Sequence, residues 1–146
     1  MLKPFRLKLL RAAAVELYGD LGAWTYDTYT TFNELFFDGA LSLKGVQWGI
    51  TPYSNSLGFY NPRLDSITLH QSLLEASSNG TGNPWGLGRK MGKSLSSDVL
   101  LHEMIHQWLY QQNYCKSNDD MHNSKPWCDE LNRISQLLKL PYYHTR

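Results

Sequence analysis

The chain contains 146 residues, carries a formal net charge of +1 at neutral pH and is 42% hydrophobic. This length and composition fit one globular domain with a hydrophobic core, so we expect a single domain over residues 1–146. The balanced charge gives no reason to expect a polyanionic partner, and two cysteines are too few for a disulfide framework.

Two helices are predicted at the start of the chain. The first covers residues 5–18. Its inward-facing residues are expected to be Phe5, Leu9, Leu10, Ala13 and Leu17. The second runs from Trp24 to Phe37 and ends at Asp38-Gly39. Its inward-facing residues are expected to be Tyr29, Phe32, Leu35 and Phe36.

No targeting signal or membrane span is expected. Arg11 and Glu16 interrupt the apolar residues near the N-terminus, so the run is too short for a signal peptide. No later segment is long and apolar enough to cross a bilayer. We therefore expect a soluble cytoplasmic protein.

The middle of the chain predicts a small, mostly antiparallel sheet. Three segments alternate in polarity or are rich in β-branched residues, and they are residues 46–50, 57–60 and 66–70. Residues 61–66 supply turn chemistry between the last two strands. An edge strand of such a sheet can bind an extended peptide as a further strand. His70, at the end of the third strand, is expected to be hydrogen-bonded there.

Residues 77–95 are rich in glycine and are expected to form a loop, which we interpret as a mobile flap. Gly92-Lys93-Ser94 resembles the end of a phosphate-binding loop. However, Leu87 stands where that motif requires a glycine, so nucleotide binding is rejected. A candidate contact for a DNA backbone consists of the basic residues Arg89, Lys90 and Lys93.

Residues 96–109 form a predicted helix with the motif HExxH at His102, Glu103 and His106. The two histidines are four residues apart on one helical face, with Cβ atoms about 5–6 Å apart, so both imidazoles can bind one metal ion. Glu103 is poorly placed as a third ligand but can reach a water on that ion. The apolar residues of this helix lie on all its sides, so we expect it to be largely buried. Burying a polar side chain costs free energy unless a partner pairs with it. The pattern is that of a zinc peptidase.

Spacing leaves the third zinc ligand open. Leu109 and Gln112 stand where metzincins have glycine and histidine, which excludes that class. Two residues are suitably spaced: His122, which lies in a polar segment, and Glu130, which lies in a further predicted helix. Asp129 is a weaker candidate from the same helix as Glu130. That helix is expected over residues 127–139. Its inward-facing residues are expected to be Trp127, Leu131, Ile134, Leu137 and Leu138.

Three parts of the chain carry a resemblance to a known family. They are the helix end NELFFDGAL at residues 33–41, the strand segments 57–60 and 67–69, and HEMIHQW at residues 102–108. Together they resemble the SprT family of metallopeptidases, which includes the protease domain of Spartan, and the similarity extends over about residues 24–138. The resemblance implies a compact α+β domain of the minimal zincin type (gluzincin-like), with N-terminal helices, a small sheet, the HExxH helix and a C-terminal helix.

The same resemblance implies that His122 is the third zinc ligand. In the family, this histidine is followed by a short polar stretch, an aromatic residue and a helix, as in His122 to Trp127. The chain departs from the family at Asn123, where glycine is usual, and it lacks the C-terminal four-cysteine zinc ribbon of many members. Cys115 and Cys128 flank His122 and are expected to be free thiols.

The sequence therefore predicts a zinc endopeptidase in which His102, His106 and His122 hold Zn²⁺ and Glu103 is the general base. Its substrates are expected to be proteins or peptides, including DNA-associated or crosslinked proteins through the resemblance. The alternative is a non-catalytic, zinc-stabilised module that binds DNA or a protein partner. Retention of Glu103 favours the enzyme, because a structural zinc site needs no base. The oxyanion donor stays open among His70, Tyr114, Tyr142 and Tyr143.

Overall fold

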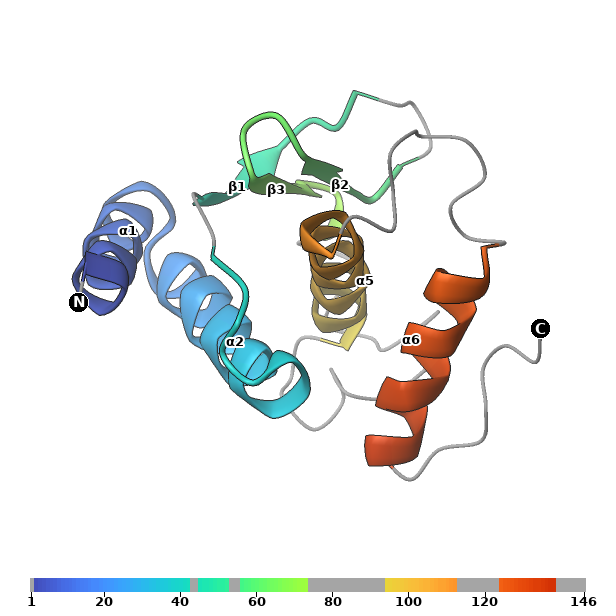
Figure 1. Ribbon diagram of the computed structural model, residues 1–146. Helices are drawn as coiled ribbons and strands as arrows, with labels where there is room; N and C mark the ends of the chain where they lie inside the picture. Colours follow the sequence, from blue (N-terminus) through green and yellow to red (C-terminus); the bar gives the residue numbers. More distant parts are fainter. Residues whose placement is uncertain (1, 43–44, 53–55, 74–93, 113–123, 139–146) are drawn as a thin grey trace.

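The computed structural model describes residues 2–42, 45–52, 56–73, 94–112 and 124–138. Its elements are α1 (Leu2–Tyr18), α2 (Asp20–Phe37), β1 (Gly45–Gly49), β2 (Gly58–Asn61), β3 (Ser66–His70), α5 (Ser94–Gln111) and α6 (Lys125–Leu137). These four helices and the three-stranded sheet confirm the predicted α+β class for the described part of the chain. Figure 1 shows α5 in the middle, between the sheet, α2 and α6.

Helices α1 and α2 are joined by a single residue, Gly19, and pack closely together. Gly19 has a φ of 63°, in the left-handed region that favours glycine. A Cβ on Gly22 would lie 2.1 Å from the carbonyl oxygen of Ala14, so only glycine permits this approach. The guanidinium of Arg11 donates two hydrogen bonds to the Asp27 carboxylate, at 2.8 and 3.0 Å. The two helices therefore form a tight hairpin.

The buried face of α1 differs from the prediction. Leu9 and Leu17 are 55% and 73% exposed, and Ala13 is also exposed, whereas Ala14 is buried. The close approach at Gly22 explains the difference, because it turns Ala14 rather than Ala13 toward α2. The orientation of this helix is therefore set by a contact between two backbones. Such a contact produces no pattern of apolar residues in the sequence.

Helix α2 ends where the sequence predicted. Asp38 follows it with a φ of 53°, and its N–H bonds to the carbonyl of Asn33. Most of the predicted inward residues are buried, namely Tyr29, Phe32 and Phe36. The prediction for Leu35 is wrong, because this side chain is 62% exposed and Phe37 is buried instead, against the ring of Trp108 (5.6 Å).

The sheet is mixed rather than mostly antiparallel. Strand β3 lies in the centre, with β1 and β2 on its two sides. Strand β2 pairs antiparallel with β3 across the predicted turn, in which Asp65 has a φ of 48°. Strand β1 pairs with β3 in parallel, so the predicted orientation is wrong for this pair. The reason is topological: β2 lies on the far side of β3, so β1 and β2 are consecutive in the sequence but are not neighbours in the sheet.

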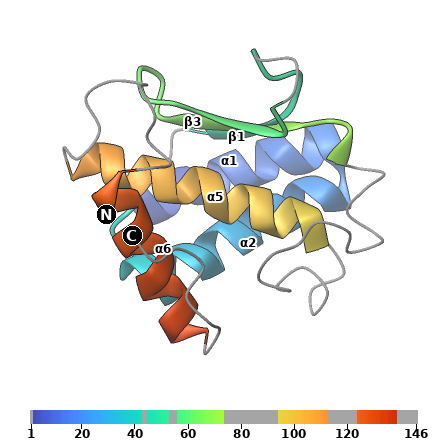
Figure 2. The same cartoon turned by 90° about the vertical axis from the view of Figure 1, so that its right-hand side faces the viewer.

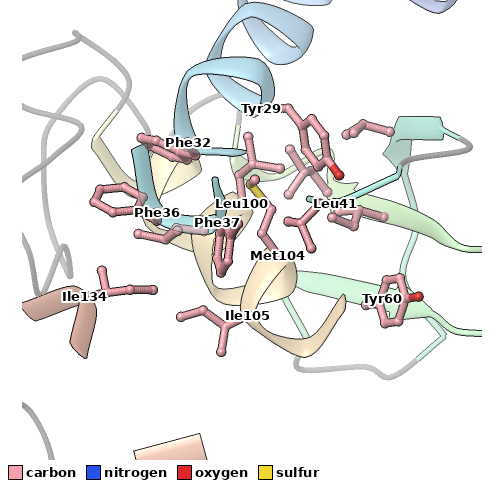
Figure 3. Close-up of a cluster of buried hydrophobic side chains, with 14 of the residues drawn as sticks. Tyr29, Phe32, Phe36, Phe37, Leu41, Tyr60, Leu100, Met104, Ile105 and Ile134 are labelled. Atoms are coloured by element: carbon pink, nitrogen blue, oxygen red, sulfur yellow. The ribbon is translucent and has the colours of Figure 1, made fainter. Parts of the chain in front are cut away.

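The hydrophobic core lies around α5. Figure 2 shows the helices beneath one face of the sheet, with α5 next to it. The fully buried apolar side chains of α5 are Leu100, Leu101, Met104, Ile105 and Leu109. Figure 3 shows Leu100, Met104 and Ile105 gathered with aromatic side chains of α2, with Tyr60 on the sheet side and Ile134 on the α6 side. Helix α5 is thus held from three directions, which gives its side chains fixed positions.

The two C-terminal helices start slightly earlier than predicted, α5 at Ser94 and α6 at Lys125. The Ser124 side chain caps α6 by accepting a hydrogen bond from the backbone N–H of Trp127, and Pro126 lies in the first turn. Of the residues predicted to face inward, Trp127, Leu131 and Ile134 are buried, whereas Leu137 is exposed. No helix among the described residues has the length and apolar character needed to span a membrane.

Candidate metal centre

Helix α5 brings His102, Glu103 and His106 together. One potential ligand atom from each lies within 4.8 Å of the others, and the two imidazole centroids are 5.0 Å apart. Both histidines are partly exposed, whereas Glu103 is buried. The helical spacing thus produces one cluster of nitrogen and oxygen donors that solvent can reach.

This donor set fits a zinc ion. Imidazole nitrogen and carboxylate oxygen are both common zinc ligands. Tetrahedral zinc, with bonds of about 2.1 Å, places neighbouring ligand atoms about 3.4 Å apart. Both histidines stand on the same face of one helix, so their imidazoles can approach a common ion. These two imidazoles would hold the ion.

Glu103 occupies an unusual environment for a carboxylate. Its Oε2 atom lies 4.0 Å from Nε2 of His102, and the backbone N–H of Tyr60 on β2 donates to the carboxylate. Burial raises the pKa of Glu103 to about 8, and the hydrogen bond from Tyr60 opposes that shift only in part. A cation on the neighbouring imidazoles would favour the charged form and bring the pKa down. Glu103 can therefore accept and release a proton near neutral pH.

Trp127 of α6 forms a wall beside the two histidines. Its ring stacks on that of His106, with centroids 4.4 Å apart and planes at 30°. The same ring meets His102 edge-on, with centroids 4.9 Å apart. These contacts restrict the orientation of both imidazoles. The sequence predicted that Trp127 faces inward but gave it no part in the site, although it is the aromatic residue of the motif that follows His122.

Gln107 anchors α5 directly beside His106. Its side-chain oxygen accepts a hydrogen bond from the Tyr29 hydroxyl (2.9 Å), and its amide nitrogen donates to the carbonyl of Ser42 (2.9 Å) and the carboxylate of Asp65 (3.2 Å). Burial raises the pKa of Tyr29, so this hydroxyl stays protonated and donates. No sequence pattern predicted this network. The only signal was a glutamine inside a buried helix, because buried amides require partners.

No protein-family model and no curated protein matches this chain.

Two alternative acidic ligands point elsewhere. Glu130 is buried but forms an ion pair with Arg133, which also donates to the carbonyl of Phe36. Asp129 is exposed and pairs with Lys125 at 2.7 Å. Neither belongs to the cluster of potential ligands found among the described residues. Both carboxylates therefore form ion pairs within α6, and the partner of Glu130 also connects α6 to α2.

The remaining predicted residues divide into two groups. His70 lies at the strand end with its Nδ1 atom 2.8 Å from the Ser72 hydroxyl, and Cys128 is a buried free thiol, both as expected. The others lie outside the described residues, and they are His122, Cys115, Arg89, Lys90, Lys93, Tyr114, Tyr142 and Tyr143.

Proposed function

We propose that the chain is a zinc-dependent endopeptidase with a minimal zincin domain of the SprT type. The observation that carries the proposal is the buried carboxylate of Glu103, 4.0 Å from Nε2 of His102, on the helix that also presents His106. A structural zinc site requires only ligands, so a buried base beside them favours catalysis. The resemblance of residues 33–41 and 102–108 to the SprT family supports the same conclusion.

Each side chain has a distinct role in this proposal. His102 and His106 hold Zn²⁺, and the resemblance adds His122 as the third protein ligand. When bound, the zinc ion would act as a Lewis acid and activate a water molecule. Glu103 accepts the proton of the attacking water and delivers it to the nitrogen of the leaving amine, so that the hydroxyl is added to the carbonyl carbon. Trp127 keeps both imidazoles oriented.

Substrates of this enzyme are proteins or peptides, and proteins attached to DNA are included through the resemblance. The alternative function is a zinc-stabilised binding module without catalysis. Nothing in that alternative accounts for the cost of burying Glu103 next to His102.

Metal analysis combined with casein digestion, with and without DNA, tests the proposal. We expect the purified chain to contain zinc and to digest casein, and we expect a chelator to abolish digestion. The variant Glu103→Gln should keep its zinc and lose digestion. Equal digestion by the two proteins would exclude Glu103 as the base, and zinc without digestion by the parent would favour the binding module.

Zinc content of single variants tests the third ligand. His122→Ala should lose zinc, whereas Glu130→Ala should keep it, because Glu130 is already paired with Arg133. His70→Ala is the matched control, because His70 bonds with Ser72. Loss of zinc in Glu130→Ala but not in His122→Ala would identify Glu130, rather than His122, as the third ligand.

A further inference from the structure

Among the described strands, β2 lies at one edge of the sheet, and its peptide groups alternate between facing β3 and facing away from it. The N–H of His70 donates to the carbonyl of Leu57 at 2.9 Å, and Gly58 is opposite Leu69 in the next pair. The hydrogen-bonded pairs of the ladder therefore include Phe59, whereas the peptide groups of Gly58 and Tyr60 point away from β3.

Both outward-pointing residues already have partners within the chain. The N–H of Tyr60 donates to the Glu103 carboxylate, and the carbonyl of Gly58 accepts a hydrogen bond from the Ser56 hydroxyl. The open edge of β2 thus holds the side chain of Glu103 on α5.

Gly58 also provides the space in which that side chain lies. A Cβ at this position would come within 2.9 Å of Oε2 and 3.0 Å of Cγ of Glu103, and within 2.6 Å of Cγ1 of Val99. Gly49 on β1, the other edge strand, offers a contrast, because a Cβ there would meet nothing within 4 Å. Of these two glycines, Gly58 is the one at which an added side chain would displace a carboxylate.

We propose that Gly58 and Tyr60 are positioning residues for Glu103: the missing side chain of Gly58 leaves room for the carboxylate, and the backbone N–H of Tyr60 fixes it beside His102. The proposal rests on the proposed function where it treats Glu103 as the general base. Its geometric part, the contact between β2 and the Glu103 side chain, does not depend on that function.

Kinetics of glycine variants provide the first test. Gly58→Ala should lower kcat for casein about 10- to 100-fold, because a displaced base no longer reaches the attacking water. Zinc content and KM should stay within about twofold of the parent, because His102 and His106 are untouched. Gly49→Ala, which adds the same methyl group to the other edge strand, should leave kcat unchanged. A Gly58→Ala variant as active as Gly49→Ala would overturn the proposal.

A second substitution separates displacement of Glu103 from simple overpacking. Val99→Ala, added to Gly58→Ala, removes one of the two clashing side chains. We expect the double variant to regain thermal stability but not kcat, because the new methyl group still meets Glu103. Recovery of kcat would show that Gly58 merely makes room for Val99.

Amide hydrogen exchange provides a test that requires no peptidase activity. The N–H of Tyr60 should exchange at least about tenfold faster in Glu103→Ala and Gly58→Ala than in the parent, because its acceptor is removed or displaced. Gly49→Ala should leave that exchange rate unchanged. If the parent fails to digest casein, the proposed function fails while this measurement still decides the geometry. Equal exchange rates in the parent and Glu103→Ala would overturn the positioning role.

Discussion

Glu103 and Gln107 stand one helical turn apart on α5, and both are buried polar side chains. The amide of Gln107 is bonded to Tyr29, Ser42 and Asp65. The carboxylate of Glu103 receives a backbone hydrogen bond from Tyr60, and within the described residues no lysine or arginine pairs with it. The amide of Gln107 is therefore hydrogen-bonded through both its oxygen and its nitrogen, whereas burial destabilises the charged form of Glu103.

This difference separates a structural role from a chemical one. A fully bonded amide stabilises a single arrangement of α5, α2 and the turn before β3. A buried carboxylate with few partners costs stability and gains a pKa near neutrality, which is what a general base needs. The network of Gln107 offsets part of that cost by holding the next turn of the same helix.

The largest expected effect is loss of activity in Glu103→Gln. We expect casein digestion to fall by about 10²- to 10⁴-fold, because the amide cannot accept the proton of the attacking water. Thermal stability should not fall, because the substitution replaces a poorly solvated acid by a neutral side chain of the same shape. Loss of stability with retained activity would reverse the two roles that we assign to Glu103 and Gln107.

Gln107→Ala should show the opposite pattern. We expect the free energy of unfolding to fall by about 3 kcal/mol, because the Tyr29 hydroxyl, the Ser42 carbonyl and the Asp65 carboxylate all lose a partner. Urea denaturation measures this change. The fraction that stays folded should keep its zinc and digest casein within a few fold of the parent. A selective fall in kcat would contradict the structural role.

The stability of the metal-free chain should depend on pH through Glu103. Its pKa rises from an ordinary 4.5 to about 8 on folding, so the folded state holds the proton more tightly than the unfolded state. This contribution is fully present below pH 4.5 and is lost as the pH rises toward 8. Between pH 6 and 7.5 the loss should be about 2 kcal/mol.

Urea denaturation of the metal-free parent and of Glu103→Gln checks this prediction across that range. The difference between the two proteins should shift steadily in favour of Glu103→Gln as the pH rises. A difference that does not change with pH would show that the carboxylate is well solvated.

The smallest expected effect concerns Tyr29→Phe. This substitution removes one donor from the network of Gln107 and keeps the aromatic ring in the core. We expect the free energy of unfolding to fall by about 1 kcal/mol, with digestion of casein unchanged. A larger fall in activity than in stability would show that the network acts on the site.

The features predicted correctly are those encoded by local spacing. The HExxH pattern places His102 and His106 on one helical face, and the turn before β3 has its own residue signals. Which strands are neighbours is not local, so the parallel pairing of β1 with β3 was missed. The orientation of α1 was also missed, since it depends on the approach of Ala14 to Gly22 in another helix.

Site residues follow the same division. Glu103 was predicted from its place between the two histidines, whereas its partner Tyr60 lies in a strand far away in the sequence. Likewise, no sequence spacing connects Gln107 with Ser42 or Asp65, because only the folded chain brings them together. The role of Trp127 beside both histidines depends on how α6 packs against α5.

The outward-facing groups of β2 have a consequence for solubility. Exposed strand edges are sites at which two copies of a protein can join and aggregate. In this chain the N–H of Tyr60 and the carbonyl of Gly58 are both bonded internally, to Glu103 and Ser56. The edge therefore offers fewer free groups to a second copy of the protein, because the contact that orients the carboxylate also occupies one of its donors.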